Sequence, residues 1–125
     1  MTKEEAIEKQ YAMAVANFEK VLKEKKSEFI RDAAILRFEL TFDLAWKCLK
    51  RYLQSKKNTI CLSPKDCFRE GYAKGIITYE DKWIKLADER NAAVHTYKKE
   101  LAEALYEKLP EFLKLFKELE KALKK

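Results

Sequence analysis

The sequence has few residues that interrupt helices. Its 125 residues include only two glycines and two prolines, the two residue types that most often break helices or form tight turns. Charged residues make up 38% of the chain and hydrophobic residues 47%, a composition that excludes a disordered or low-complexity chain. No apolar run approaches the length of a membrane span, so we expect no membrane segment.

Cysteine and histidine are also scarce. The chain has three cysteines and one histidine. Cys48, Cys61 and Cys67 include no C-x-x-C pair, and there is no second histidine to complete a tetrahedral zinc site. We therefore expect no metal, no cofactor and no disulfide framework. The residues from Met1 to Glu5 carry acids where a signal peptide would be basic and then apolar, which favours a cytoplasmic protein.

The charge balance is moderately basic. Lys and Arg number 27 against 21 Asp and Glu, a formal net charge of +6. This surplus permits a nucleic acid or an acidic partner but identifies neither.

Apolar residues recur with helical spacing along most of the chain. The pattern predicts one all-α domain over residues 1–125, an antiparallel bundle of about five helices with a four-helix up-and-down core plus one short helix. A helical chain of this length often completes its core by dimerising. The expected helices begin near Ile7, Phe29, Ser63, Thr78 and Leu101, with a loop over residues 55–62 and with Pro110 bending or splitting the last helix.

The second expected helix, from Phe29 to Leu53, is apolar on more than one side and is therefore central or part of a subunit interface. Glu39, Thr41 and Asp43 are its polar exceptions. If they are buried, they need partners or water.

The segment from Arg90 to Tyr97 is the strongest candidate for a functional site, because it contains the only histidine, His95. On a helix, residues four apart share a face, so Asn91 and His95 would lie together with Arg90 nearby, and the small Ala92 and Ala93 would let a second helix or a phosphate approach. A base, a cation and an amide so placed suit an anionic ligand.

A second group of cations precedes the expected loop. Lys47, Lys50 and Arg51 lie in a stretch without acids and would contact RNA or nucleotide phosphates. The alternative, which we prefer, is that cations near a helix C-terminus offset its dipole. Trp46 and Trp83 are expected in the core rather than stacked on a base.

Arg90-Asn91 with His95 four positions later resembles the R-x4-H motif of HEPN domains, small helical bundles of prokaryotic toxin–antitoxin and defence systems. Further landmarks resemble the nucleotidyltransferase substrate-binding protein group of that superfamily, over nearly the whole chain. These landmarks are Phe38-Glu39-Leu40, Trp46-Lys47, Ser63-Pro64, Phe68-Arg69-Glu70, Gly75-Ile76-Ile77, Trp83 and Arg90-Asn91 through His95-Thr96-Tyr97.

The resemblance implies a homodimer whose two motif helices face each other, and a partner with a minimal nucleotidyltransferase fold; it permits a heterotetramer of the two proteins. In toxin–antitoxin members the HEPN protein is a metal-independent ribonuclease, which the partner inactivates by transferring AMP to the tyrosine of an R-x4-H-x-Y motif. Arg90, His95 and Tyr97 match that motif. An older interpretation of the group is that it holds a substrate for the transferase.

Two functions follow, and whether the chain is an enzyme stays open between them. In the first, which we favour, the chain is a binding subunit that presents a substrate or Tyr97 for nucleotidyl transfer. In the second it is a ribonuclease: His95 is the base for the 2′-hydroxyl, and Arg90 stabilises the phosphate. Asn91 orients the imidazole or donates to the phosphate, and adenylylation of Tyr97 blocks the cleft. Ordinary structural roles also remain: His95 as a helix cap, Arg90 in a surface ion pair with Asp88 or its neighbours, and Tyr97 as a packing residue.

Overall fold

Only helices are found over residues 1–124, the part of the chain that the computed structural model describes. Their order and bounds are α1 Lys3–Lys23, α2 Glu28–Lys57, α3 Pro64–Ala73, α4 Glu80–Ala92, the 3-10 turn η1 Ala93–His95 and α5 Lys99–Leu123.

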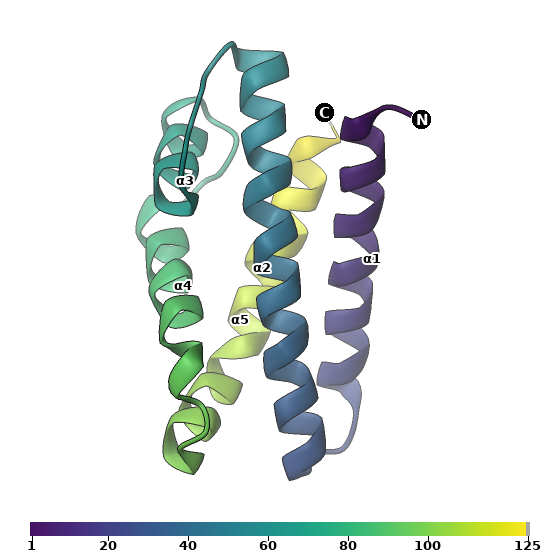
Figure 1. The fold of residues 1–125 in the computed structure, drawn as a ribbon, viewed down its shortest axis with the longest axis vertical. Helices are drawn as coiled ribbons and strands as arrows, with labels where there is room; N and C mark the ends of the chain where they lie inside the picture. Colours follow the sequence, from purple (N-terminus) through teal and green to yellow (C-terminus); the bar gives the residue numbers. More distant parts are fainter. Residues whose placement is uncertain (125) are drawn as a thin grey trace.

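The four longer helices run alternately up and down, and both chain ends lie at the same end of the bundle (Figure 1). Helix α2 occupies the centre, with α1 on one side and α3 and α4 on the other, while α5 passes behind it. The predicted all-α bundle, a four-helix core plus one short helix, is therefore confirmed. The predicted dimer stays a prediction.

The first three helices begin at residues that cap the backbone. Thr2, Ser27 and Ser63 each accept a hydrogen bond from the backbone N–H three residues later, at 3.1, 3.1 and 3.3 Å. These bonds satisfy N–H groups that have no partner within the first turn of a helix. Ser63 is followed by Pro64 at the first helical position, so the predicted start of α3 is confirmed.

The structure changes the predicted end of α2 and excludes a split at Pro110. Helix α2 continues to Lys57 and ends at Asn58, whose φ of 47° lies in the left-handed region. The predicted loop therefore starts three residues too early, because a solvent-exposed helix end needs no apolar stripe. Pro110 lies inside α5, which remains one helix.

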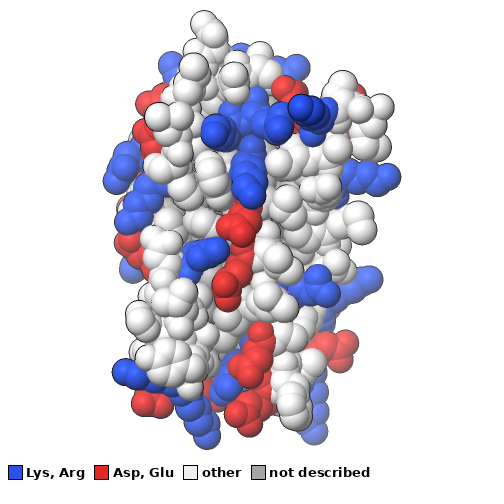
Figure 2. Space-filling model, viewed as in Figure 1, with Lys and Arg blue, Asp and Glu red and all other residues white. Residues whose placement is uncertain are grey.

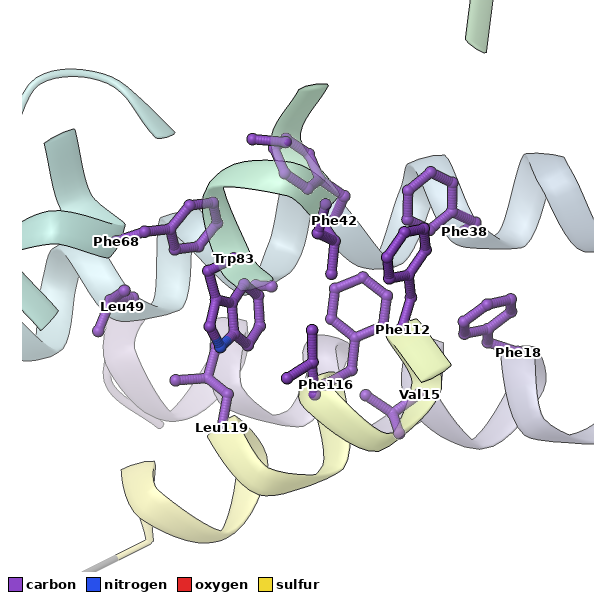
Figure 3. Close-up of a cluster of buried hydrophobic side chains, with 14 of the residues drawn as sticks. Val15, Phe18, Phe38, Phe42, Leu49, Phe68, Trp83, Phe112, Phe116 and Leu119 are labelled. Atoms are coloured by element: carbon purple, nitrogen blue, oxygen red, sulfur yellow. The ribbon is translucent and has the colours of Figure 1, made fainter. Parts of the chain in front are cut away.

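Aromatic side chains form the centre of the core (Figure 3). Phe38 of α2 contacts Phe116 of α5 with ring centroids 6.2 Å apart, and Trp83 of α4 lies 4.8 Å from Phe68 of α3. Trp83 is 1% exposed, as predicted for a core residue. Trp46 is only half-buried and packs at the edge of the core.

Two buried polar groups join α1 to its neighbours. The hydroxyl of Tyr11 donates to the carbonyl of Phe116 at 2.7 Å, and the thiol of Cys48 donates to the carbonyl of Ile7 at 3.4 Å. Burial raises the pKa of Tyr11 well above its ordinary value, and burial likewise raises the pKa of Cys48 to about 12. Both groups are therefore held in their neutral forms.

Cys61 and Cys67 form a disulfide, with Cα atoms 5.1 Å apart. We expected no disulfide framework, and this single local disulfide was not predicted. An odd number of cysteines does not exclude one local pair, and the start of α3 brings Cys67 back against the loop that carries Cys61. Cys48 is the free cysteine and is buried.

Candidate functional site at the corner between helices α4 and α5

The predicted site lies where the chain turns from α4 into α5. Helix α4 ends at Ala92, and the next three residues form the 3-10 turn η1. The hydroxyl of Thr96 donates to the carbonyl of Ala93 at 2.7 Å, a local bond that competes with continuation of the α-helix. The buried side chain of Ala93 anchors the turn in the core.

This turn corrects the predicted geometry of the motif. The i, i+4 argument required Asn91 and His95 to share one face of α4, but α4 stops at Ala92 and His95 lies in η1. Asn91 is exposed in the last turn of α4. Tyr97 lies past the helix end, as predicted.

Arg90 points toward α2. Its Nη2 lies 3.6 Å from Oδ1 of Asp43, and the guanidinium lies over the ring of Phe42 at 5.8 Å from the centroid. The Arg90 side chain is 28% exposed, and its buried Nε has no hydrogen-bond partner among residues 1–124. The buried Nε is closed to an anion, but the side chain is partly exposed and makes no hydrogen bond in this part of the chain, so the other guanidinium nitrogens can still donate to one.

The expected ion pair of Arg90 with Asp88 or its neighbours is not formed. Asp88 pairs with Lys65, and Glu89 pairs with Lys108. Arg90 is instead the partner of Asp43 of α2, whose side chain is 43% exposed.

His95 and Tyr97 lie next to each other at the surface. Their rings are 6.2 Å apart and meet edge to face. Both residues are exposed, and the Tyr97 side chain is 76% accessible. Within residues 1–124, neither the imidazole nor the phenol makes a hydrogen bond. Both groups are therefore free to react with or bind a partner molecule.

Tyr97 and Thr96 border a shallow cavity of about 290 Å³ against α2. Asp32, Leu36 and Glu39 line its other side. Glu39 and Asp43 are one turn apart on α2, so Tyr97 and Arg90 approach neighbouring turns of the same helix. In this chain His95 and Tyr97 are therefore adjacent, while Asp43 holds Arg90 against α2.

The predicted basic contacts lie further along α2. Lys47 follows Asp43 by one turn, and Lys50 lies over the ring of Trp46 at 5.8 Å from its centroid. Lys47 and Arg51 are exposed. Lys47 follows Glu39 by eight positions, a rise of about 12 Å, so these cations do not line the cavity beside Tyr97 in the same chain.

Helix α2 is divided by charge. Its acidic residues end at Asp43, and every charged residue after that position is Lys or Arg. Figure 2 shows this division on the face seen in Figure 1, with acidic side chains along the lower half of the central helix and basic ones along the upper half. Because Arg31 and Arg37 accompany the acidic residues before Asp43, the part of α2 beyond Asp43 attracts an anion more strongly than the part before it.

No three His, Cys, Asp or Glu side chains come together as a possible metal site over residues 1–124. In the same part of the chain, no helix is both long enough and apolar enough to span a bilayer.

The fold and the corner define a small antiparallel helical bundle with a histidine and a tyrosine exposed between two of its helices. Residues 8–125 match the family described as nucleotidyltransferase substrate binding protein like, and the chain belongs to this family. The resemblance to the nucleotidyltransferase substrate-binding group is thereby confirmed.

Three known proteins are similar to this chain. A probable ribonuclease HepT from Haemophilus influenzae is 38% identical over 84 residues, which span 64% of this chain and 58% of that protein. A crystal structure from Thermus thermophilus matches with a TM-score of 0.88 at 32% identity, over 92% of this chain and 99% of the other. A Haemophilus influenzae structure, described as the fold of a substrate binding domain of a nucleotidyltransferase, matches with a TM-score of 0.73 at 28% identity, over 98% of this chain and 97% of the other.

Proposed function

We propose that this chain dimerises, binds a cognate minimal nucleotidyltransferase and presents Tyr97 to it for nucleotidyl transfer. The observation that carries the proposal is the exposure of Tyr97, whose phenol projects from the α4–α5 corner without a hydrogen-bond partner in residues 1–124. An aromatic side chain so exposed contributes little to the stability of the monomer. The family supports a nucleotidyltransferase as the partner.

The transfer step requires an accessible hydroxyl. The phenol oxygen of Tyr97 attacks the α-phosphorus of ATP, its proton passes to a base, and the bond to pyrophosphate breaks. The product is a tyrosine adenylyl ester plus pyrophosphate. Because Tyr97 borders a shallow cavity instead of a deep one, a second protein can bring a nucleotide to it.

The dimer is proposed from an exposed apolar strip. Leu36 and Leu40 are one turn apart on α2 and are 56% and 45% exposed. Leu36 shares a cavity with Tyr97, and Leu40 shares another with the exposed Met13 of α1. The strip therefore continues from α1 across α2 to the candidate site, so a second copy bound there would lie beside Tyr97 and contribute to one composite groove.

The position of Arg90 favours this binding function over catalysis. Its charge is shared with Asp43, and Glu39 and Asp32 line the cavity beside Tyr97. In a single chain these carboxylates oppose a negatively charged RNA backbone. The same carboxylates would face the triphosphate of ATP during transfer to Tyr97, but in that function the nucleotidyltransferase, and not this chain, holds the phosphates.

Intact-mass measurement tests the proposed transfer. The purified chain is incubated with its nucleotidyltransferase and ATP, and we expect the mass to increase by one or more adenylyl groups. Tyr97→Phe should abolish the increase, whereas Tyr79→Phe, which removes a partly exposed phenol elsewhere, should preserve it. An increase that persists in Tyr97→Phe would place the acceptor at another residue.

The ribonuclease is the second candidate. It is favoured by the exposed imidazole of His95, which makes no hydrogen bond within residues 1–124, and by the name of the relative from Haemophilus influenzae. In this function His95 takes the 2′-hydroxyl proton, the 2′-oxygen attacks phosphorus, and the 5′-oxygen leaves with a proton from the imidazolium of His95 of the partner subunit. Arg90 and Asn91 would bind the phosphate.

In this second function, Lys47, Lys50 and Arg51 are proposed to hold RNA beyond the acidic part of α2. Purified protein should then cleave RNA in the presence of a metal chelator, and both His95→Ala and Arg90→Ala should lose this activity. Cleavage that survives His95→Ala would remove the imidazole from the mechanism.

A further inference from the structure

A second and larger pocket lies at the opposite end of the bundle from the α4–α5 corner. It has a volume of about 490 Å³ and is formed by the end of α2, the connection between α3 and α4, and the end of α5. Figure 1 shows that these segments meet near the chain termini, away from the turn that carries His95. A volume of this size is within the range of small-molecule sites.

Trp83 supplies an unused hydrogen-bond donor to this pocket. Its side chain is 1% exposed and lines the pocket, yet its indole N–H donates to no atom of residues 1–124. The nitrogen lies on the side of the ring nearest Leu119, another lining residue (Figure 3). The indole nitrogen is not among the fully buried polar atoms that lack a partner, so it reaches the open space of the pocket, where an acceptor can bind it.

Three lysines surround the pocket. Lys57, Lys74 and Lys121 line it, and within residues 1–124 none of them forms an ion pair. Glu118 is the only carboxylate among the described lining residues, so the lining carries three positive charges and one negative, a net +2. These lysines lie near the ends of α2, α3 and α5, where they also offset the helix dipoles. Their interaction with the helix dipoles leaves the indole N–H of Trp83 without an acceptor, because a lysine ammonium group only donates hydrogen bonds.

We propose that this pocket binds a mononucleotide. An acceptor atom of the base would receive the hydrogen bond of Trp83, and the phosphate would lie among Lys57, Lys74 and Lys121. Tyr52, which also lines the pocket, offers an aromatic surface beside the base. The site is separate from Tyr97, so it does not depend on the proposed transfer.

Nuclear magnetic resonance of the indole N–H tests this assignment directly. In a Trp46→Phe variant the remaining indole signal belongs to Trp83, because the chain has two tryptophans. The four ribonucleoside monophosphates are titrated separately into this protein. We expect at least one to move the Trp83 signal saturably, in the direction of a stronger hydrogen bond. The matching nucleoside and inorganic phosphate should each bind more weakly.

Matched lysine variants separate the pocket from general charge. Lys57→Gln with Lys121→Gln removes two lining cations and should weaken binding by about tenfold or more, the effect of one charged hydrogen bond. Lys9→Gln with Lys114→Gln changes the net charge equally at exposed residues outside the pocket and should leave affinity unchanged.

Three results would overturn the proposal. The first is no saturable shift of Trp83 with any of the four nucleotides. The second is equal weakening by the two double variants, which would indicate nonspecific attraction. The third is a response to inorganic phosphate as strong as that to the nucleotides, which would show an anion site without a base.

Discussion

Replacing Tyr11 with phenylalanine removes one hydroxyl from the core and leaves the ring. That hydroxyl donates to the carbonyl of Phe116 across 105 residues of sequence and ties α1 to α5. The carbonyl belongs to the continuous helix α5, so it keeps its helical partner when the hydroxyl is lost. We therefore expect Tyr11→Phe to lower the free energy of unfolding by about 1 kcal/mol near pH 7, the net value of one hydrogen bond.

The same phenol makes this difference depend on pH. Burial raises the pKa of Tyr11 in the folded protein well above 10.0, its ordinary value. In the unfolded chain the phenol releases its proton above pH 10, whereas the folded protein keeps it, so wild-type stability falls as pH rises above 10. At one pH unit above 10.0, the ordinary pKa of the unfolded phenol, the wild type has lost about 1.4 kcal/mol of its free energy of unfolding. This loss then exceeds the hydrogen bond, and Tyr11→Phe becomes the more stable protein.

Urea unfolding of both proteins at several pH values, followed by circular dichroism, measures this crossing. We expect the two stabilities to become equal at about pH 10 to 11. Burial raises the pKa of Cys48 to about 12, so its thiol stays mostly neutral in both folded proteins over this interval and contributes equally to the two stabilities. Tyr72→Phe is the control, because its phenol is 47% exposed and makes no hydrogen bond within residues 1–124. A stability difference that stays constant from pH 7 to beyond that interval would show that the folded protein does not hold the Tyr11 proton.

Three further predictions concern the dimer, the turn before α4 and the disulfide. Leu40→Glu should shift the protein from dimer toward monomer in light scattering. Ile60→Glu, at an exposed apolar residue outside the strip of Leu36, Leu40 and Met13, should leave the dimer intact. A dimer that persists in Leu40→Glu would exclude this interface. Gly75→Ala places a side chain at φ +77° and should cost about 1 kcal/mol in urea unfolding; an unchanged midpoint would contradict this. Reduction of the Cys61–Cys67 disulfide, or Ser at both positions, releases a loop of sequence separation 6 and should cost roughly 2 kcal/mol; equal stability of oxidised and reduced protein would contradict it.

Periodic patterns predicted the bundle because each long helix buries one apolar face, and the spacing of apolar residues along the sequence shows that face. The start of α3 was also predictable from local sequence, because Ser63 caps the helix by a hydrogen bond to a nearby backbone N–H and Pro64 occupies its first position. The far end of α2 was not, because its last residues are polar and exposed and carry no periodic signal.

The candidate site was predictable as a segment but not as a geometry. The motif located Arg90, His95 and Tyr97, whereas the 3-10 turn after Ala92 depends on the way α5 packs against Ala93. The pairing of Arg90 with Asp43 joins residues 47 positions apart and depends on the packing of α4 against α2. Such contacts follow from the tertiary structure and leave no local pattern.

The proposed acceptor role of Tyr97 can be checked by locating the modified residue within the chain. Trypsin cleaves after Arg90 and Lys98 and releases residues 91–98, in which Tyr97 is the only tyrosine. After co-expression with the nucleotidyltransferase, tandem mass spectrometry should place adenylyl groups on Tyr97 in this peptide. An active complex that yields only the unmodified peptide would contradict this role and would favour a chain that holds a separate substrate.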